Sequence, residues 1–384
     1  MKSRSDKHRS LRAPGLTIVA IALLAIMQCA TSRSKQEHTT APSLAETVCT
    51  PLHNSLADIC RQFDVPGLTI VVTYKERLVY SDAVGYADRE DSEPVSPESL
   101  FRIASVSKVI TEIALLKLSE EKKLQLDDVV LGENGILGTA FGTPPKGSQI
   151  DKITVRNLMD HKSGWTNSPN DPMFNYPGLS QKDLITLVVT TRKLASAPGS
   201  TYYYLNFGYC VLGRVIEKIT GMTYEEYVQR EVLAPCGISD MQIGRNSLAD
   251  RLPGEVKYYP TLGEVRYQTL PLFSPYNLDV ARMDSHGGWV ASAIDLAKFM
   301  TRIDREPIVP DIVSSEQMKG TYLGYETWWK NGSLPGTTSI VCRLNSDINF
   351  VVLANTRTEL DPNRINKALR IAISSYLEKI QDWP

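Results

Sequence analysis

The chain has 384 residues, 42% of them hydrophobic, and its 42 Lys and Arg residues nearly balance its 43 Asp and Glu residues. This composition is typical of a folded globular protein and excludes a disordered or fibrous chain. Because no basic excess is present to neutralise phosphates, the composition argues against nucleic acid as a partner and favours a small-molecule or peptide substrate.

The first thirty residues differ in character from the rest of the chain. Five Lys and Arg residues within the first twelve positions precede an apolar run over residues 16–27. This pattern predicts a signal peptide over residues 1–30, because the run is shorter than the ~20 residues that a membrane-spanning helix needs. We therefore expect an exported protein of the periplasm or cell envelope, which contacts the membrane only through this N-terminal segment.

Cys29 follows the apolar run directly, where a bacterial lipoprotein would be cleaved and acylated. A lipid anchor at Cys29 and a cysteine within a discarded signal peptide both stay open, because Met27 and Gln28 are bulkier than the residues such cleavage sites prefer. The other five cysteines are far apart and lack CxxC spacing, which argues against a zinc cluster. We expect these cysteines to be buried as small apolar residues, and we expect neither a metal site nor a cofactor.

The folded part of the chain begins after a polar segment. Residues 31–43 are aperiodic, which predicts a linker, and residues 44–384 are expected to form one domain. Two β-rich runs at residues 68–74 and 77–84 predict a hairpin near the start of this domain. A helix of about four turns should then begin at Ser105, since the apolar residues that follow keep helical spacing.

Helices dominate the middle of the chain. A helix over residues 207–220 should end at Gly221, and the next should begin at Thr223, with Glu226 completing a capping box. A last helix, capped by Asp361, is expected near the C-terminus.

Strands return at residues 338–344 and 348–355. With hairpins at both ends and helices between them, the sequence predicts an α+β fold: an antiparallel sheet built from N- and C-terminal segments, flanked by helices, with an inserted helical subdomain. The sheet part should cover about residues 44–118 and 285–384, and the insert about residues 119–284. An active site is expected between the two parts.

Ser105 and Lys108 place a hydroxyl and an amine on one face of a helix. A serine becomes a nucleophile when a neighbour takes its proton, and lysine can do so if burial or another cation lowers its pKa. The same S-x-x-K spacing occurs at Ser32, in the linker, and at Ser119, in a charged run at a helix end. We therefore predict Ser105 as the nucleophile, Lys108 as its base and the N–H of Ser105 as an oxyanion donor.

A second polar pair precedes the helix near residue 207. In an extended segment, residues two apart point the same way, so the Tyr204 phenol and the Asn206 amide can face one cavity. The phenol could relay a proton to the leaving group, and the amide could hold a substrate carbonyl. The alternative is a buried tyrosine followed by a helix-capping asparagine.

The third motif, Lys330-Asn331-Gly332, lies at the edge of the C-terminal strands. Lys330 would supply a second cation that attracts a substrate carboxylate and lowers the pKa of the base or the phenol. Gly332 would let the substrate backbone approach the strand closely. Residues 162–164 are a more literal K-S-G match, but they precede the second motif, so position favours Lys330. An ordinary exposed strand lysine is the alternative.

In this order, the three motifs resemble the signature of serine β-lactamases and penicillin-binding proteins. The chain is most similar to the class C β-lactamase branch, with its D-alanyl-D-alanine carboxypeptidase and esterase relatives, over about residues 65–355. Residues 153–164, ITVRNLMDHKSG, are similar to the family's I-T-V-R-N-L-L-T-H-T-S-G stretch, which makes Lys162 a structural residue. Asn331 departs from the family pattern, where Thr or Ser is usual.

The resemblance implies a two-domain fold and acylation of Ser105, with proton transfer shared by Lys108 and Tyr204. It also implies an oxyanion hole formed by the N–H groups of Ser105 and Ser333. The expected protein is a monomeric serine hydrolase acting on a β-lactam, a D-Ala-D-Ala-type peptide or a small ester or amide.

Two other classes of enzyme and one class of binding protein are alternatives to this interpretation. No G-x-S-x-G and no H-E-x-x-H pentapeptide occurs, which argues against an α/β-hydrolase triad and a metallohydrolase. His161 and His286 are interpreted as structural. The remaining alternative is a non-catalytic penicillin-recognising sensor or cell-wall binding module.

Overall fold

The computed structural model describes residues 46–260, 274–358 and 363–384. The predicted signal peptide, the linker and Cys29 lie outside these residues, as does the helix cap expected at Asp361.

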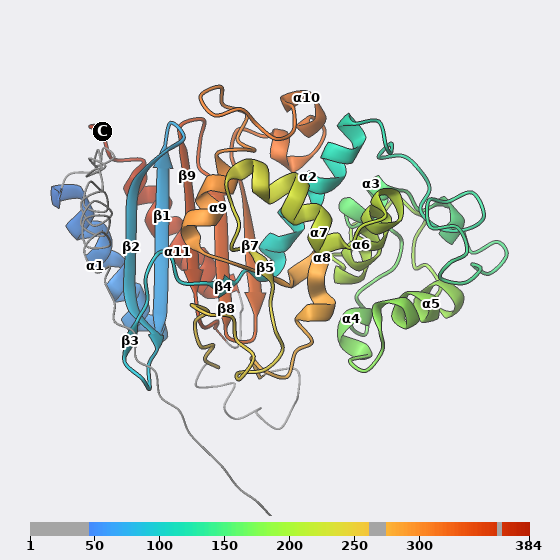
Figure 1. The fold of residues 1–384 in the computed structure, drawn as a ribbon, viewed down its shortest axis with the longest axis horizontal. Coiled ribbons are helices and arrows are strands. Elements are labelled where there is room, and N and C mark those ends of the chain that lie inside the picture. The colour runs from blue at the N-terminus through green and yellow to red at the C-terminus, as the bar shows by residue number, and fades with distance from the viewer. Residues whose placement is uncertain (1–45, 261–273, 359–362) are drawn as a thin grey trace, which may run out of the picture. The chain divides into compact units, whose positions relative to one another are not determined.

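A six-stranded antiparallel sheet, with strand order β3-β2-β1-β9-β8-β7, is the main β structure (Figure 1). Its strands are β1 (Gly67–Tyr74), β2 (Arg77–Asp88), β3 (Glu93–Pro94), β7 (Trp328–Leu334), β8 (Thr337–Arg343) and β9 (Ile348–Ala354). The two hairpins expected from the sequence are present as β1–β2 and β8–β9. Because β1 also pairs with β9, N- and C-terminal segments share one sheet, which confirms the predicted α+β fold.

Helices cover both faces of this sheet. The covering elements are α1 (Glu46–Phe63) and α11 (Asn363–Leu377) on one face, and α9 (Ala293–Met300) with the short helix η1 (Ala104–Val106) on the other. Along β9, Phe350 and Val352 pack with the α1 and α11 side chains, whereas Val351 and Leu353 join the opposite core. Double coverage explains why β8 and β9 are buried at every residue and why β9, INFVVLA, is nearly a continuous hydrophobic run.

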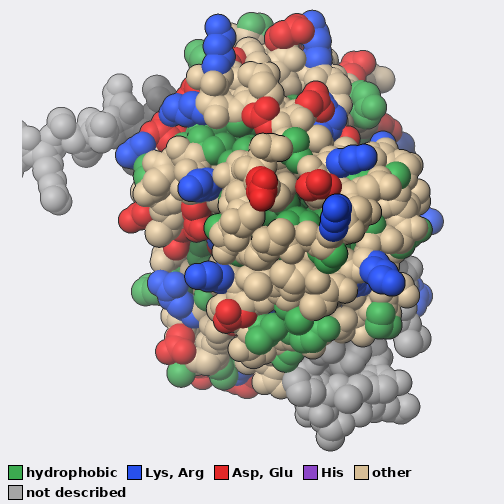
Figure 2. Space-filling view, turned by 90° about the vertical axis from the view of Figure 1, so that its right-hand side faces the viewer, with side chains coloured by type: hydrophobic (Ala, Val, Ile, Leu, Met, Phe, Trp, Pro, Cys, Tyr) green, Lys and Arg blue, Asp and Glu red, His purple; other side chains and the backbone are tan. Residues whose placement is uncertain are grey.

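The rest of the molecule is mainly helical. Its helices are α2 (Ser107–Glu120), α3 (Val155–Met159), α4 (Pro172–Asn175), α5 (Gln181–Thr191), α6 (Asn206–Thr220), α7 (Tyr224–Val228), α8 (Asp284–Gly287) and α10 (Ser315–Met318). Figure 1 shows α2, α7 and α8 between the large sheet and the group formed by α3 to α6. The face at this helical end carries positive and negative side chains interspersed (Figure 2).

The helix boundaries in this region follow local signals. Gly221 ends α6 with φ +70°, in the left-handed region that glycine adopts without steric cost, and Thr223 and Glu226 form the expected capping box of α7. Helix α1 and a small sheet of order β4-β6-β5 are additions to the predicted elements. The strands of this sheet are β4 (Phe101–Arg102), β5 (Gln242–Ile243) and β6 (Trp289–Ala291).

Three of the cysteines, Cys60, Cys210 and Cys342, are buried in the two main cores, as small apolar residues would be. Within the described ranges, no group of three or more His, Cys, Asp or Glu side chains could hold a metal ion. In the same part of the chain, every helix is too short or too polar to cross a membrane.

Candidate active site

Ser105 lies at the turn that connects strand β4 to helix α2. The preceding residue, Ala104, has φ +46°, a left-handed conformation that is uncommon outside glycine and that bends the chain sharply here. Ser105 is the second residue of η1, and the first N–H groups of a helix have no acceptor within it. The Ser105 N–H is therefore suited to bind developing negative charge.

Lys108 is 1% exposed, and its amine faces three oxygen atoms. Lys108 Nζ lies 2.7 Å from the carbonyl oxygen of His286, 2.8 Å from Asn206 Oδ1 and 3.2 Å from Ser105 Oγ. A neutral amine has two N–H bonds and one lone pair. If the two N–H groups donate to the carbonyl and the amide, the lone pair is left to accept the serine proton.

The electrostatic surroundings of Lys108 favour this neutral form. Burial is the main cause that lowers the pKa of Lys108 to about 7, and the charge of Lys330 lowers it further. The carboxylates of Asp171 and Glu112 act in the opposite direction. Near neutral pH, a large fraction of Lys108 is thus able to accept a proton.

Tyr204 approaches Ser105 from another direction. Its hydroxyl donates a hydrogen bond of 2.7 Å to Ser105 Oγ. Burial raises the pKa of Tyr204, while the hydrogen bond and the charge of Lys330 lower it. The imidazole of His161 packs on the phenol, with ring centroids 4.4 Å apart, and its Nδ1 accepts the N–H of Leu205 at 3.1 Å. Burial lowers the pKa of His161 to about 3, so its ring is a neutral support for Tyr204.

Asn206 is the first residue of α6 and contacts the base directly. Its side-chain oxygen accepts a hydrogen bond from the Lys108 amine, and its backbone N–H donates a hydrogen bond to Asp171 Oδ2. Asp171 also caps α4 by accepting the N–H of Met173 at 3.0 Å. The Asn206 side-chain oxygen thus orients Lys108, and because Asn206 also lines the cavity at Ser105, its expected hold on a substrate carbonyl through the amide N–H group stays a prediction.

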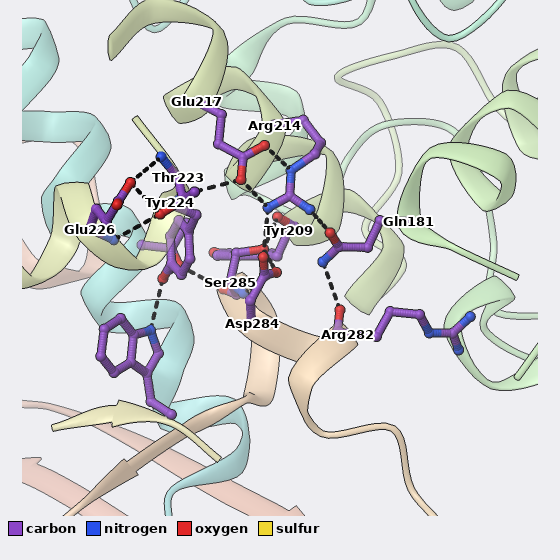
Figure 3. A network of polar contacts seen from close by, with 12 residues as sticks. Gln181, Tyr209, Arg214, Glu217, Thr223, Tyr224, Glu226, Arg282, Asp284 and Ser285 are labelled. Carbon is purple, nitrogen blue, oxygen red and sulfur yellow. Dashed lines mark hydrogen bonds and ion pairs between the residues drawn. The ribbon is translucent and has the colours of Figure 1, made fainter. Parts of the chain in front are cut away.

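A buried ion pair holds the turn that presents the His286 carbonyl to Lys108 (Figure 3). Arg214 Nη2 on α6 donates to Asp284 Oδ2 at 2.6 Å, and Asp284 Oδ1 accepts the N–H of Ser285 at 2.6 Å. The carbonyl of Ser285, the residue before His286, accepts a hydrogen bond of 2.6 Å from the Thr111 hydroxyl. These contacts tie α6 and α2 to the two residues that precede His286.

A cavity of about 320 Å³ opens beside Ser105. Apolar side chains form one part of its wall, among them Phe174, Leu278, Met283 and Leu334. Polar residues at Ser105 form the other part, among them Tyr204, Asn206 and Ser333. A cavity of this size with a few convergent polar groups is typical of a small-molecule site.

Strand β7 carries the third motif past this site, and the residues of the motif differ from one another in what they contact. Lys330 does not line the Ser105 cavity: it lines a second one, of about 310 Å³, and its Nζ lies 3.9 Å from Glu112 Oε1. Lys330 thus acts on Lys108 and Tyr204 through its charge.

The side of Gly332 on which a Cβ atom would stand is filled by protein, and the expected close approach of a substrate backbone stays a prediction. A Cβ atom here would lie 2.1 Å from Ser339 Oγ and 2.3 Å from the Ile103 carbonyl oxygen. Asn331, next to it, has a buried side-chain oxygen without a hydrogen-bond partner among the described residues and is not part of the Ser105 cavity wall. Ser333 reaches that wall, where its N–H could act together with that of Ser105.

The structure therefore brings Ser105, Lys108, Tyr204 and Asn206 into hydrogen-bond contact, with Ser333 at the same cavity. Three further residues act on Lys108 without belonging to a recognisable sequence motif: His286, Asp171 and Glu112. His286 acts through its backbone carbonyl, which any residue type supplies, and Asp171 is distant from Lys108 in the chain. Glu112 has one signal, its spacing of four residues after Lys108, which places both on one helix face.

Comparisons with known proteins identify the family of the chain. Residues 56–374 match the family model described as Beta-lactamase. The putative penicillin-binding protein PbpX of Bacillus subtilis (strain 168) is 24% identical over 327 residues, which cover 83% of this chain and 77% of PbpX. A putative D-alanyl-D-alanine carboxypeptidase of Salmonella paratyphi A is 29% identical over 236 residues, 58% of this chain and 54% of that protein.

A solved structure shares the fold. The D-amino acid amidase from Ochrobactrum anthropi SV3 has a TM-score of 0.66 and 20% identity, over 85% of this chain and 98% of that one.

Proposed function

Because the chain belongs to the beta-lactamase family and is a hydrolase of that kind, we propose that it works through an acyl-enzyme on Ser105. The observation that carries this proposal is the convergence of two proton carriers on one hydroxyl. Lys108 Nζ lies 3.2 Å and the Tyr204 hydroxyl 2.7 Å from Ser105 Oγ. A base and an acid within reach of one nucleophile are what acyl transfer requires.

In the proposed acylation, neutral Lys108 accepts the Ser105 proton while Oγ bonds to the substrate carbonyl carbon. The N–H groups of Ser105 and Ser333 stabilise the oxyanion. As the bond to the leaving group breaks, Tyr204 donates its proton to that group, and the proton held by Lys108 restores the phenol. A water molecule then attacks the acyl-enzyme by the reverse route and releases Ser105.

The proposed substrates are a β-lactam, a D-Ala-D-Ala-type peptide or a small ester or amide. The names of the relatives support this range, since one is a putative D-alanyl-D-alanine carboxypeptidase and a structural neighbour is a D-amino acid amidase. The cavity of about 320 Å³ is of a size for a small acyl group. Rates with nitrocefin, a D-Ala-D-Ala peptide and p-nitrophenyl acetate would rank the three classes.

The acyl-enzyme is tested by intact mass after incubation with a fluorophosphonate and with a fluorescent penicillin. We expect an adduct on the wild type and none on Ser105→Ala. No adduct on the wild type, or an equal adduct on the variant, would contradict the proposal. A penicillin adduct without turnover of any of the three substrates would instead support the penicillin-recognising sensor.

We also propose that the protein is exported, on the basis of the basic start and the apolar run of residues 16–27. Expression of the full chain in a bacterium, followed by fractionation, tests this. If Cys29 is acylated, the wild type should partition with membranes and Cys29→Ser should not. A full-length cytoplasmic product would contradict export.

A further inference from the structure

Glu112 is a buried acid next to the catalytic groups that the proposed mechanism does not use. It is 3% exposed and lies on α2, one helical turn after Lys108. Its Oε1 accepts the hydroxyl of Tyr209. A carboxylate in such a place needs a compensating positive charge.

Lys330 supplies that charge from strand β7. Its Nζ lies 3.9 Å from Glu112 Oε1 and 3.9 Å from the ring centroid of Tyr322, in cation–π contact. The Lys330 side chain is 26% exposed, so both attractions act in surroundings that water screens only partly. Together they keep the ammonium group in the second cavity.

Four groups face the Glu112 carboxylate, each from a different element: Lys108 from α2, Tyr209 from α6, Lys330 from β7 and Tyr322 from η8 (Tyr322–Gly324). Two of them are amines, and two are phenols whose pKa values are raised well above the usual one, chiefly by burial and then by the Glu112 charge. At neutral pH the phenols carry no charge. Lys330 is then the cation whose position depends most directly on Glu112.

We propose that Glu112 is a positioning residue that retains Lys330 in the second cavity and so sets substrate preference. A substrate carboxylate beside the scissile bond must compete with Glu112 and Tyr322 for the Lys330 ammonium group. Uncharged esters and amides do not face this competition. The enzyme therefore favours substrates without a carboxylate at that position. This inference rests on the proposed acylation of Ser105.

The test compares two esters that share an acyl group, one whose leaving group carries a free carboxylate and one in which that carboxylate is a carboxamide. Glu112→Gln keeps an oxygen for the Tyr209 hydroxyl and removes the negative charge. We expect the ratio of kcat/KM, carboxylate over carboxamide, to rise about tenfold, the effect of one partly buried charge pair. The rise should come from a lower KM for the carboxylate ester.

The acid limb of the pH–rate profile is a second readout. Removal of the Glu112 charge disfavours protonated Lys108, so the limb should move to lower pH in Glu112→Gln. A purely structural role of Glu112 would lower the rates of both esters and leave their ratio unchanged.

Two further variants make the test specific. In Glu112→Gln combined with Lys330→Met, the gain for the carboxylate ester should disappear, because its cation is gone. Asp160→Asn is the matched control: Asp160 lines the same cavity and interacts with the Lys330 charge at longer range, with no ion pair to Lys330 among the described residues, so the ratio should change much less than in Glu112→Gln. An unchanged ratio in Glu112→Gln would overturn the inference.

Lys330→Met alone provides an independent check should Glu112→Gln fail to fold. If Lys330 is retained by Glu112, its loss should slow both esters to a similar extent. A selective loss of about tenfold for the carboxylate ester would overturn the inference. A wild type that forms no adduct on Ser105 would overturn the proposed function instead, so the two failures are distinguishable.

Discussion

The α-carbon of Gly332 on strand β7 lies so close to the main chain of Ile103 that a Cβ atom would stand 2.3 Å from the Ile103 carbonyl oxygen. Ile103 comes two residues before Ser105, at the start of the sharp turn into α2. The hydroxyl of Ser339 donates to the same carbonyl at 2.6 Å. Two adjacent strands of the large sheet thus fix the turn that carries the nucleophile.

Gly332→Ala should therefore impair catalysis through displacement of this turn. We expect kcat/KM with p-nitrophenyl acetate to fall about 100-fold, the usual cost of a misplacement of about 1 Å. Gly178→Ala is the control, because a Cβ atom there would meet no atom within 4 Å. Equal activity of the two variants would contradict this account of Gly332.

The pH dependence should reflect the neutral form of Lys108. With a pKa of about 7, Lys108 is protonated below neutrality and cannot accept the Ser105 proton, so kcat/KM should fall as the pH drops below about 7. Lys330→Met removes a cation that lowers this pKa, and the acid limb should therefore move to higher pH. A profile that is flat from pH 5 to 9 would rule out Lys108 as the base.

Tyr204→Phe should separate proton transfer from packing. The variant loses the hydroxyl that donates to Ser105 Oγ but keeps the ring against His161. We expect kcat to fall about 10²- to 10⁴-fold, the usual contribution of a general acid, with little change in Tm. Tyr202→Phe is the matched control, since this neighbouring phenol is 59% exposed. Wild-type rates in Tyr204→Phe would contradict its role.

Loss of Arg214 should destabilise the whole fold. Its side chain is 8% exposed, and its partner Asp284 would be left with a buried, uncompensated charge. Arg214→Met should therefore lower the free energy of unfolding by about 3–5 kcal/mol, measured by urea denaturation. Arg230→Met is the control: Arg230 is 65% exposed in its pair with Glu231, and its loss should cost less than about 1 kcal/mol. Similar losses in both variants would contradict the prediction.

Much of the fold could be predicted because its signals are local. The hairpins, the closure of α6 at Gly221 and the capping box at Thr223 each depend on residues a few positions apart. Helix α1 and the small sheet were not predicted. Strands β4 and β5 are two residues long, too short for a periodic pattern, and β4 and β6 are far apart in the chain.

The sequence by itself determined that Ser105 and Lys108 can act together, because a helix places residues three apart on one face whatever surrounds it. Tertiary structure alone decided the state of those groups. Burial lowers the pKa of Lys108, the carbonyl of His286 accepts a hydrogen bond from its amine, and Lys330 lies 3.9 Å from Glu112 Oε1 in the second cavity. Burial and charge pairing depend on which segments meet in space, and residues far apart in the chain meet here only when the fold is complete.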